Sequence, residues 1–323
     1  MTDSPVILAN KGDRPTKNGF GEGLLEAGRI NDNVMALGAD ITGSVGMDLF
    51  ASELPDRFFS LGIAEQNCVG VAAGMALSGK IPVFATYGVF SALRTTDFIR
   101  VSVCYNNLHV VIGGAHAGIS VGPDGATHQA LEDLAIMRVL PNMTVLSPCD
   151  ATQTRLATLA AIQQLNGPVY LRFGRAPVPD FTSQDDDFII GKAKMMAPGD
   201  DATIIATGHL VWEALKAHHM LKSKEISARV INMHTIKPLD EKAIIKAAQE
   251  TGVIVTSEEH QVIGGLGSAV AECLSANLPS PVEFVGMPDR FGESGDPREL
   301  MAKYGMSAEQ IVLSVEKAIS RKK

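Results

Sequence analysis

Short apolar runs alternate with longer stretches of helical pattern along the first half of the chain. These runs have the length of strands and lie at residues 34–38, 58–62, 83–86, 109–113, 144–146 and 169–173. Continuous apolar runs of this kind are typical of strands in a parallel sheet that helices cover on both faces. The pattern therefore predicts a doubly wound α/β domain over residues 16–175, preceded by an N-terminal leader at 1–15.

The pattern changes after residue 175. Prolines and carboxylates replace the apolar runs, with Ala-Pro-Val-Pro-Asp at 176–180 and three aspartates at 185–187. Such a composition cannot form a core, so we predict a linker over residues 176–200. A second alternation follows and predicts another doubly wound, mostly parallel-sheet α/β domain over 201–323. Its strands are expected at 203–207, 228–232, 253–257 and 282–286.

Composition narrows the class of partner. The 323 residues include 28 Lys and Arg against 36 Asp and Glu, without a long basic block, which argues against nucleic acid and anionic membrane as partners. No apolar run reaches the roughly 18 residues of a membrane span, and residues 1–15 lack the apolar core of a secretory signal. The four cysteines lie far apart, without disulfide-framework or zinc spacing, so we predict a cytoplasmic protein.

Two segments that follow predicted strands carry candidate chemistry. Glu65 comes just after the strand at 58–62, at the edge where open α/β sheets bind ligands. A glutamate here can also face the positive end of a helix dipole, and the residue alone leaves both interpretations open. The loop at 113–128 combines five glycines with His116, Asp124 and His128, side chains that bind polyhydroxylated substrates or transfer protons. Their spacing fits no standard metal site, so no metal ligand is predicted.

The strings GIAEQ at 62–66, DGATHQ at 124–129 and EEHQVIGGLG at 258–267 identify a family. Together they are similar to transketolase and its relative 1-deoxyxylulose-5-phosphate synthase, which use thiamine diphosphate. The resemblance covers essentially the whole chain and implies a pyrimidine-binding domain followed by a transketolase C-terminal domain.

An absence is equally informative. The family holds diphosphate and Mg²⁺ (or Ca²⁺) through a Gly-Asp-Gly motif and a later Asn on an N-terminal domain, and no Gly-Asp-Gly occurs in this sequence. The resemblance therefore implies the C-terminal subunit of a split transketolase. It is expected to be active only with a separate N-terminal partner subunit that carries this motif and the metal, in an α2β2 heterotetramer.

The resemblance also implies which residues contact the cofactor. Glu65 matches the family glutamate that hydrogen-bonds the aminopyrimidine ring, and Phe90 matches the aromatic that stacks on this ring. Tyr87 and Asp40 are expected beside the cofactor. For Phe90, an ordinary place in the hydrophobic core stays the alternative.

Substrate contacts are implied in the same way. Asp124 matches an aspartate that contacts a substrate hydroxyl, and His128 matches a histidine beside the reacting carbonyl, which we count as catalytic together with Glu65. The side chains expected to hold a sugar phosphate, or another terminal anion, are His116, Ser44, Arg172 and Lys17. Lys17 replaces the arginine of many transketolases and offers a point charge without bidentate geometry.

The predicted function, in carbohydrate metabolism, is transfer of a two-carbon ketol unit from a ketose, expected to be phosphorylated, to an aldose. His116 favours transketolase, since the synthase has arginine in the corresponding loop. A synthase-like or 2-oxoacid dehydrogenase beta-type subunit stays an alternative, and the retained site residues argue against a non-catalytic scaffold. In the C-terminal domain we expect no catalytic residue, and structural or interfacial roles for Glu258, Glu259 and His260.

Overall fold

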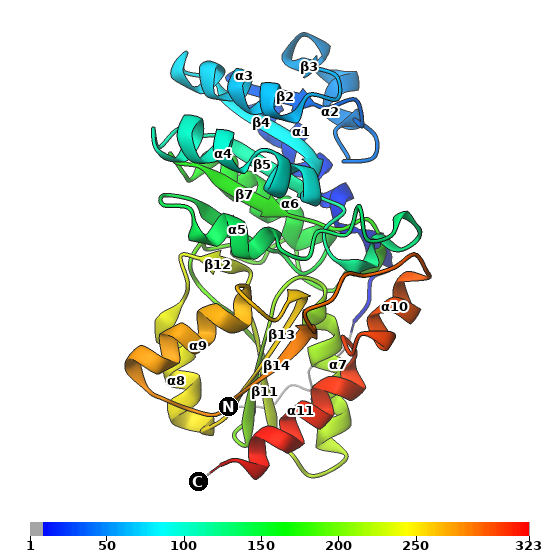
Figure 1. Cartoon of the computed structure of the whole chain (residues 1–323), viewed down its shortest axis with the longest axis vertical. Coiled ribbons are helices and arrows are strands. Elements are labelled where there is room, and N and C mark those ends of the chain that lie inside the picture. The colour runs from blue at the N-terminus through cyan, green and yellow to red at the C-terminus, as the bar shows by residue number, and fades with distance from the viewer. Residues whose placement is uncertain (1–8, 323) are drawn as a thin grey trace.

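The computed structural model describes residues 9–322 and contains two α/β domains that follow one another along the long axis of the molecule (Figure 1). The first domain is built on a seven-stranded sheet in the order β12-β6-β7-β5-β4-β2-β3, in which only the edge strand β12 is antiparallel to its neighbour. The predicted doubly wound, mostly parallel domain is confirmed. Its strands are β2 (Val34–Gly38), β3 (Phe58–Ser60), β4 (Ile81–Tyr87), β5 (Val111–Ala115), β6 (Thr144–Leu146), β7 (Val169–Arg172) and β12 (Thr235–Lys237).

Helices connect these strands and cover the sheet. They are α1 (Thr16–Ile30), α2 (Asp48–Glu53), η1 (Pro55–Arg57), α3 (Glu65–Leu77), η2 (Phe90–Arg94), α4 (Thr96–Phe98), η3 (Ile99–Cys104), η4 (Ile119–Asp124), α5 (Asp133–Val139) and α6 (Ala151–Gln163). Polar caps fix some of the boundaries, as at the start of α6, where the Asp150 carboxylate accepts a hydrogen bond from the Gln153 N–H. No helix in the described part of the chain is long and apolar enough to cross a lipid bilayer.

The second domain has a five-stranded sheet in the order β14-β13-β10-β11-β9, and it confirms the second predicted α/β unit. Its strands are β9 (Lys194–Ala197), β10 (Ala202–Ala206), β11 (Ala228–Asn232), β13 (Ile254–Gln261) and β14 (Val282–Met287). The edge strand β9 is antiparallel, and the remaining pairs are parallel. The helices are α7 (Leu210–Lys222), α8 (Glu241–Thr251), α9 (Leu266–Asn277), α10 (Pro297–Lys303) and α11 (Ala308–Ser320).

The segment predicted as a linker is more ordered than its composition indicates. Strand β8 (Pro177–Pro179) pairs antiparallel with β1 (Asp13–Pro15), and β9 belongs to the second sheet. Buried carboxylates hold the intervening chain, since Asp150 accepts hydrogen bonds from the backbone N–H groups of Phe181 and Thr182. The predicted leader therefore contributes a strand at its end, while its residues 1–8 lie outside the described residues.

Strand β12 joins the two domains. It follows β11 of the second sheet in the chain, yet it pairs antiparallel with β6 at the edge of the first sheet. A single hydrophobic cluster also contains buried side chains of both domains, among them Leu134 and Val145 of the first and Ile205 and Ile254 of the second. The domains therefore share a packed interface, which fixes the loops that lie along it.

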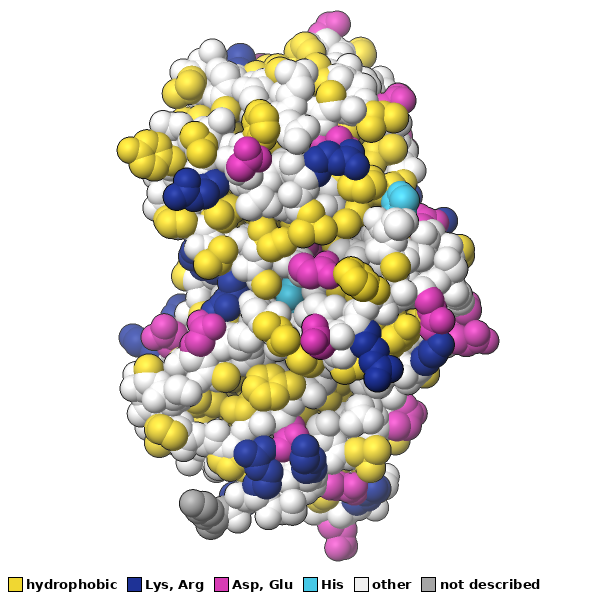
Figure 2. Space-filling model, in the orientation of Figure 1, with side chains coloured by type: hydrophobic (Ala, Val, Ile, Leu, Met, Phe, Trp, Pro, Cys, Tyr) yellow, Lys and Arg dark blue, Asp and Glu magenta, His cyan; other side chains and the backbone are white. Residues whose placement is uncertain are grey.

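The surface is of mixed charge. On the face shown in Figure 2, Lys and Arg side chains lie singly or in small groups among Asp and Glu, and apolar side chains are scattered between them. This distribution agrees with the formal net charge of −8. It does not form, on that face, the continuous basic surface that nucleic-acid binding requires.

The close contact between α1 and α6 gives a test of the packing. A Cβ on Gly19 of α1 would lie 1.9 Å from the Ala151 carbonyl oxygen at the start of α6. Because this oxygen belongs to the backbone, the two helices would have to move apart to make room for a side chain. We expect Gly19→Ala to lower the free energy of unfolding of the chain by about 1–3 kcal/mol, the usual cost of overpacking. Urea unfolding measures this change.

Gly74 of α3 is the matched control, because among the described residues nothing outside its own stretch of helix lies within 4 Å of its Cβ position. There the same substitution should raise the stability of the isolated chain by about 0.5–1 kcal/mol, since alanine is the better helix former. Equal effects at the two glycines would contradict the close helix contact.

Candidate active site

The candidate side chains gather at one edge of the first sheet. Asp40 follows β2, Glu65 follows β3, Tyr87 ends β4 and His116 follows β5. Because the carboxyl ends of parallel strands meet at the same edge, residues far apart in sequence come together there. Strand β2 lies between β3 and β4, so the chain reverses its direction of travel across the sheet at this point. Open α/β sheets bind ligands at such a reversal.

Glu65 is the first residue of α3, and its side chain is buried, with 3% of its surface exposed. Its Oε2 atom accepts a hydrogen bond of 2.8 Å from Nη1 of Arg94, whose guanidinium lies 4.3 Å from the centre of the Phe90 ring. Sequence reasoning did not find Arg94, because nothing in the spacing of residues 65 and 94 indicates contact. The carboxylate thus faces the site with one cationic partner, which is itself partly exposed.

Four rings form a cluster beside Glu65. The rings of Tyr87 and His116 are 4.3 Å apart between centroids, and those of Phe90 and His128 are 5.5 Å apart in an edge-on arrangement. Tyr87 also lies within 5.7 Å of His128 and 6.0 Å of Phe90. The structure therefore brings together aromatic and imidazole groups from three separate segments.

His116 combines burial with an uncommon backbone conformation. Its φ is +52°, its side chain is 3% exposed, and its Nδ1 atom has no hydrogen-bond partner among the described residues. Burial, together with the smaller effects of the positive charges of Arg175 and Lys17, lowers the pKa of His116 to about 4. Asp40 also has a positive φ, of +63°. Such strained residues cluster at functional sites, because only a demand for a particular side-chain position justifies their cost.

Charged groups surround His116. Asp124 and Arg175 form an ion pair of 2.7 Å, and Lys17 donates hydrogen bonds of 3.2 Å to the carbonyl oxygens of Gly43 and Ser44. Arg175 and Asp124 are both partly accessible. This side of the site thus offers two cations, a carboxylate and a neutral imidazole.

The structure corrects the prediction for Arg172. Its Nε donates to Oδ2 of Asp133 at 2.8 Å, and its Nη2 donates to the carbonyl oxygens of Ala130 and Glu259 at 3.1 and 2.8 Å. The side chain is 6% exposed, so its guanidinium holds the protein together and cannot receive a substrate anion. The structure therefore gives Arg172 contacts within the protein framework in place of the predicted substrate contact, whereas Arg175, three residues further on, is partly exposed beside Asp124.

A sequence signal could have separated the two arginines. Arg172 lies inside the predicted strand at 169–173, whereas Arg175 comes just after its carboxyl end, where ligand contacts concentrate.

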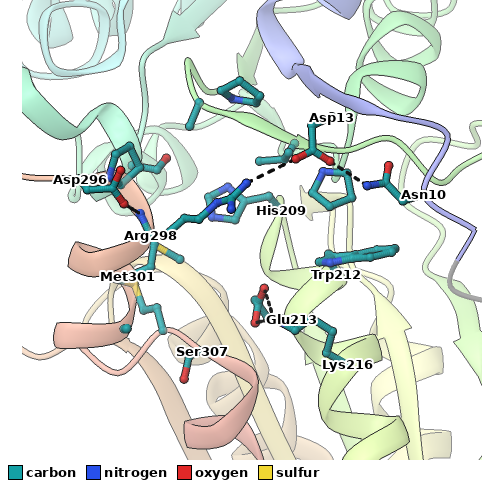
Figure 3. A pocket seen from close by; sticks show the side chains of 18 of the residues that line it. Asn10, Asp13, His209, Trp212, Glu213, Lys216, Asp296, Arg298, Met301 and Ser307 are labelled. Atoms are coloured by element: carbon teal, nitrogen blue, oxygen red, sulfur yellow. Dashed lines mark hydrogen bonds and ion pairs between the residues drawn. The ribbon is translucent and has the colours of Figure 1, made fainter.

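A cavity of about 830 Å³ opens between the two domains (Figure 3). Trp212 and Met301 provide apolar wall, and the charged side chains pair with one another, as Arg298 does with Asp13 and Lys216 with Glu213. None of the predicted site residues lines this cavity. The described residues also contain no group of three or more His, Cys, Asp and Glu side chains that could hold a metal ion.

Comparison with known proteins agrees with this architecture. Residues 13–181 match the model of the transketolase pyrimidine-binding domain, and residues 191–311 match that of the transketolase C-terminal domain. The chain is 42% identical to the 6-deoxy-6-sulfo-D-fructose transketolase subunit SqwH of Clostridium sp. (strain MSTE9), over 93% of this chain and 92% of that protein. It is 43% identical to one subunit of the apulose-4-phosphate transketolase of Phocaeicola vulgatus, over 91% and 94% of the two chains.

A solved structure is similar over almost the whole fold. It is described as a split gene transketolase, inactive beta4 tetramer, and it superposes with a TM-score of 0.90 at 47% sequence identity. The match covers 96% of this chain and 99% of the other.

The buried imidazole of His116 gives a pH test. Its pKa in the folded chain, about 4, is below the ordinary value of 6.5, so between these values the unfolded chain binds a proton that the folded chain does not. Stability therefore rises with pH in this window, and up to about 3 kcal/mol is lost as the pH falls through it. His116→Asn should flatten this slope in urea unfolding at pH 4 to 7.

His234 has a similarly low pKa, of about 4, from burial, so the informative quantity is the difference between the parent chain and the His116→Asn variant. Proton NMR of the imidazole provides an independent measurement. A His116 resonance that titrates near 6.5 would contradict its assigned environment.

Proposed function

The chain belongs to the transketolase family, and from this premise we propose that, with a separate N-terminal subunit, it transfers a two-carbon ketol unit from an anionic ketose to an aldose. The observation that carries the proposal is the buried carboxylate of Glu65, at the reversal point of the sheet, beside the rings of Phe90, Tyr87 and His128. These groups come from different segments of the chain. Packing of the fold alone would not require a carboxylate and several rings to meet at one place.

Two observations support the need for a partner subunit: the share of its relatives that this chain spans, and the absence of the Gly-Asp-Gly motif from the sequence. The chain spans 92% and 94% of two relatives that are themselves named as transketolase subunits. The sequence has no Gly-Asp-Gly, the motif by which the family holds diphosphate and metal. A similar solved chain, described as a beta4 tetramer, is described as inactive. We propose an α2β2 assembly in which the partner subunit carries the metal. The cytoplasmic location stays a prediction.

The residues present fit the aminopyrimidine part of thiamine diphosphate. Among the described contacts, Arg94 engages only Oε2 of Glu65, which leaves Oε1 to share a proton with a ring nitrogen. Burial and the bond from Arg94 hold the carboxyl group in one orientation for such sharing. The half-buried ring of Phe90 offers a stacking surface beside Tyr87, and Asp40 lies at the same edge of the sheet, after β2. Thiamine diphosphate, when bound, supplies the nucleophilic carbon that breaks and forms carbon–carbon bonds.

The opposite side of the site is suited to the sugar. Neutral His116 can donate to a hydroxyl or carbonyl oxygen, and Asp124 can accept from a substrate hydroxyl. Thr127 engages Nδ1 of His128, so we assign Nε2 of His128 to the reacting carbonyl. Each group then binds a different oxygen of the sugar, which orients the bond to be cleaved.

The terminal anion of the sugar is assigned to Arg175 and Lys17, with Ser44 beside them. Both cations lie close enough to His116 to lower its pKa. The names of the two relatives specify a sulfo sugar and a sugar phosphate, which supports an anionic substrate for this chain. We propose a ketose with a terminal phosphate or sulfonate, which a guanidinium and an ammonium can both contact.

Replacement of Glu65 tests the function. In the complex with the N-terminal subunit, thiamine diphosphate and Mg²⁺, Glu65→Gln should reduce kcat at least about 10²-fold, because it removes the proton-sharing carboxylate. Ketose and aldose steady-state kinetics measure the change, and size-exclusion chromatography checks assembly. Without the partner subunit the chain should show no turnover.

The control is Glu53→Gln, at a glutamate that pairs with Arg29 on the surface, away from the site. This variant should behave as the parent. Activity near that of the parent in assembled Glu65→Gln, or turnover by the chain alone, would contradict the proposed function.

Arg175 tests the charge of the substrate. We expect Arg175→Ala to raise KM for an anionic ketose by about 10- to 100-fold, the worth of a charge-assisted hydrogen bond, with little change for an uncharged ketose of equal length. Arg175→Lys should give an intermediate KM, because it keeps the charge and loses the fork. The same increase for both ketoses would place Arg175 in the protein framework and remove the anionic substrate.

A further inference from the structure

We propose that the C-terminal domain positions the substrate through Glu259, whose carboxylate fixes the site loop, defined here as residues 116–128. The inference rests on the proposed substrate roles of His116, Asp124 and His128, which this loop carries. Glu259 itself touches none of them, so it is a positioning residue and takes no part in the chemistry.

The carboxylate of Glu259 enters the first domain from strand β13 of the second. Its side chain is 4% exposed, and its Oε1 atom accepts a hydrogen bond of 2.6 Å from the backbone N–H of Ser120. A Cβ on Gly118 would lie 2.1 Å from the Glu259 carboxyl carbon. The carboxylate thus fills the space that a side chain at 118 would take, two residues after His116.

Groups of both domains orient this carboxylate. Oε2 of Glu259 is 3.3 Å from Nδ1 of His209, at the start of α7, so the side chain cannot turn away without losing that contact. The backbone carbonyl of Glu259 accepts a hydrogen bond from Arg172, which also donates to the Ala130 carbonyl. The Ala130 carbonyl in turn accepts from the Gly118 N–H at 2.8 Å. The start of the site loop and Ala130, just beyond its end, are therefore both tied to β13.

The rest of the loop also rests on the C-terminal domain. Gln129 donates to the carbonyl oxygens of Ile119 and Glu293, and a Cβ on Gly122 would lie 2.9 Å from Pro297 of α10. The loop contains Gly118, Gly122 and Gly125, each with positive φ, and glycine-rich chain loses much conformational entropy when it is fixed. A charge-assisted bond to Ser120 offsets part of that cost at the end nearest His116.

Loss of this anchor should displace the substrate groups without unfolding the chain. A shift of about 1 Å in a binding group costs up to about 10²-fold in rate, even when the change lies outside the chemistry. The expected result for Glu259→Ala, in the complex with its partner subunit, is a KM for the ketose at least about 10-fold higher, with a smaller change in kcat. Glu259→Gln should stay within about threefold of the parent, because its amide oxygen still accepts from Ser120.

Glu258 provides the matched control. It is adjacent, 1% exposed, and accepts hydrogen bonds of 2.7 Å from the N–H groups of Leu266 and Gly267 at the start of α9, away from the site loop. Glu258→Ala should lower stability and leave KM unchanged. Hydrogen–deuterium exchange of the isolated chain adds a readout without substrate, since loop amides should exchange faster in Glu259→Ala and not in Glu258→Ala.

A double-mutant cycle with His116→Ala separates positioning from an independent effect. If Glu259 acts through His116, the two penalties on KM should be far from additive. Additive penalties, or equal KM and exchange in the Ala variants of Glu259 and Glu258, would overturn the proposal. If Glu259→Ala does not fold, Glu259→Asp is the second variant: it keeps the charge, but its carboxylate is one methylene shorter and loses the bond to Ser120, so it should give the same loop exchange and KM.

The results for the different variants separate a failure of this inference from a failure of the proposed function. No KM effect of His116→Ala alone would remove the substrate role of the loop, and with it the function as assigned. A KM effect of His116→Ala without one of Glu259→Ala or Glu259→Asp would leave the function and overturn only the positioning by the C-terminal domain.

Discussion

The buried ion pair between Arg172 and Asp133 is the interaction on which the arrangement of the site depends. Asp133 begins α5 and also accepts a hydrogen bond from the Tyr170 hydroxyl, while Arg172 reaches the carbonyl groups of Ala130 and Glu259. One guanidinium thus connects the interior strand β7, helix α5, the chain just after the site loop and a strand of the other domain. Removing one partner of such a pair costs several kcal/mol, because the other charge stays buried. Because Arg172 makes these framework contacts, Arg175 is not needed for them, and its exposed guanidinium is available to a ligand.

Hydrophobic pattern predicted most of the two sheets, because buried parallel strands leave a continuous apolar signal. The strands at 34–38, 144–146 and 228–232 have the predicted bounds. The pattern missed the short strands β12, β1, β8 and β9, because prolines or charged residues interrupt their apolar positions. The family resemblance predicted the candidate site at Glu65, His116, Asp124 and His128. The structure brings the rings of His116 and His128 together with those of Tyr87 and Phe90 at one edge of the first sheet.

Other features of the site could not be read from sequence. The contact of Arg94 with Glu65 depends on how a helical turn after β4 folds back, and local spacing does not encode it. Glu258 has the structural role expected for it, at the start of α9, whereas its neighbour Glu259 lies between the domains. Adjacent residues of one strand point to opposite faces, so these two glutamates serve different partners.

Strand β12 has a consequence for the order of synthesis. The first sheet reaches its edge only at Thr235–Lys237, after the chain has already passed through β9, β10 and β11 of the second sheet. A nascent chain that has emerged only as far as the end of β7 therefore holds a sheet whose β6 edge is still unpaired, and unpaired edges invite association with other chains. On the ribosome, the pyrimidine-binding domain completes its sheet only after more than half of the C-terminal domain's strands have been made. A gene that encoded the two domains as independent proteins would leave that edge open.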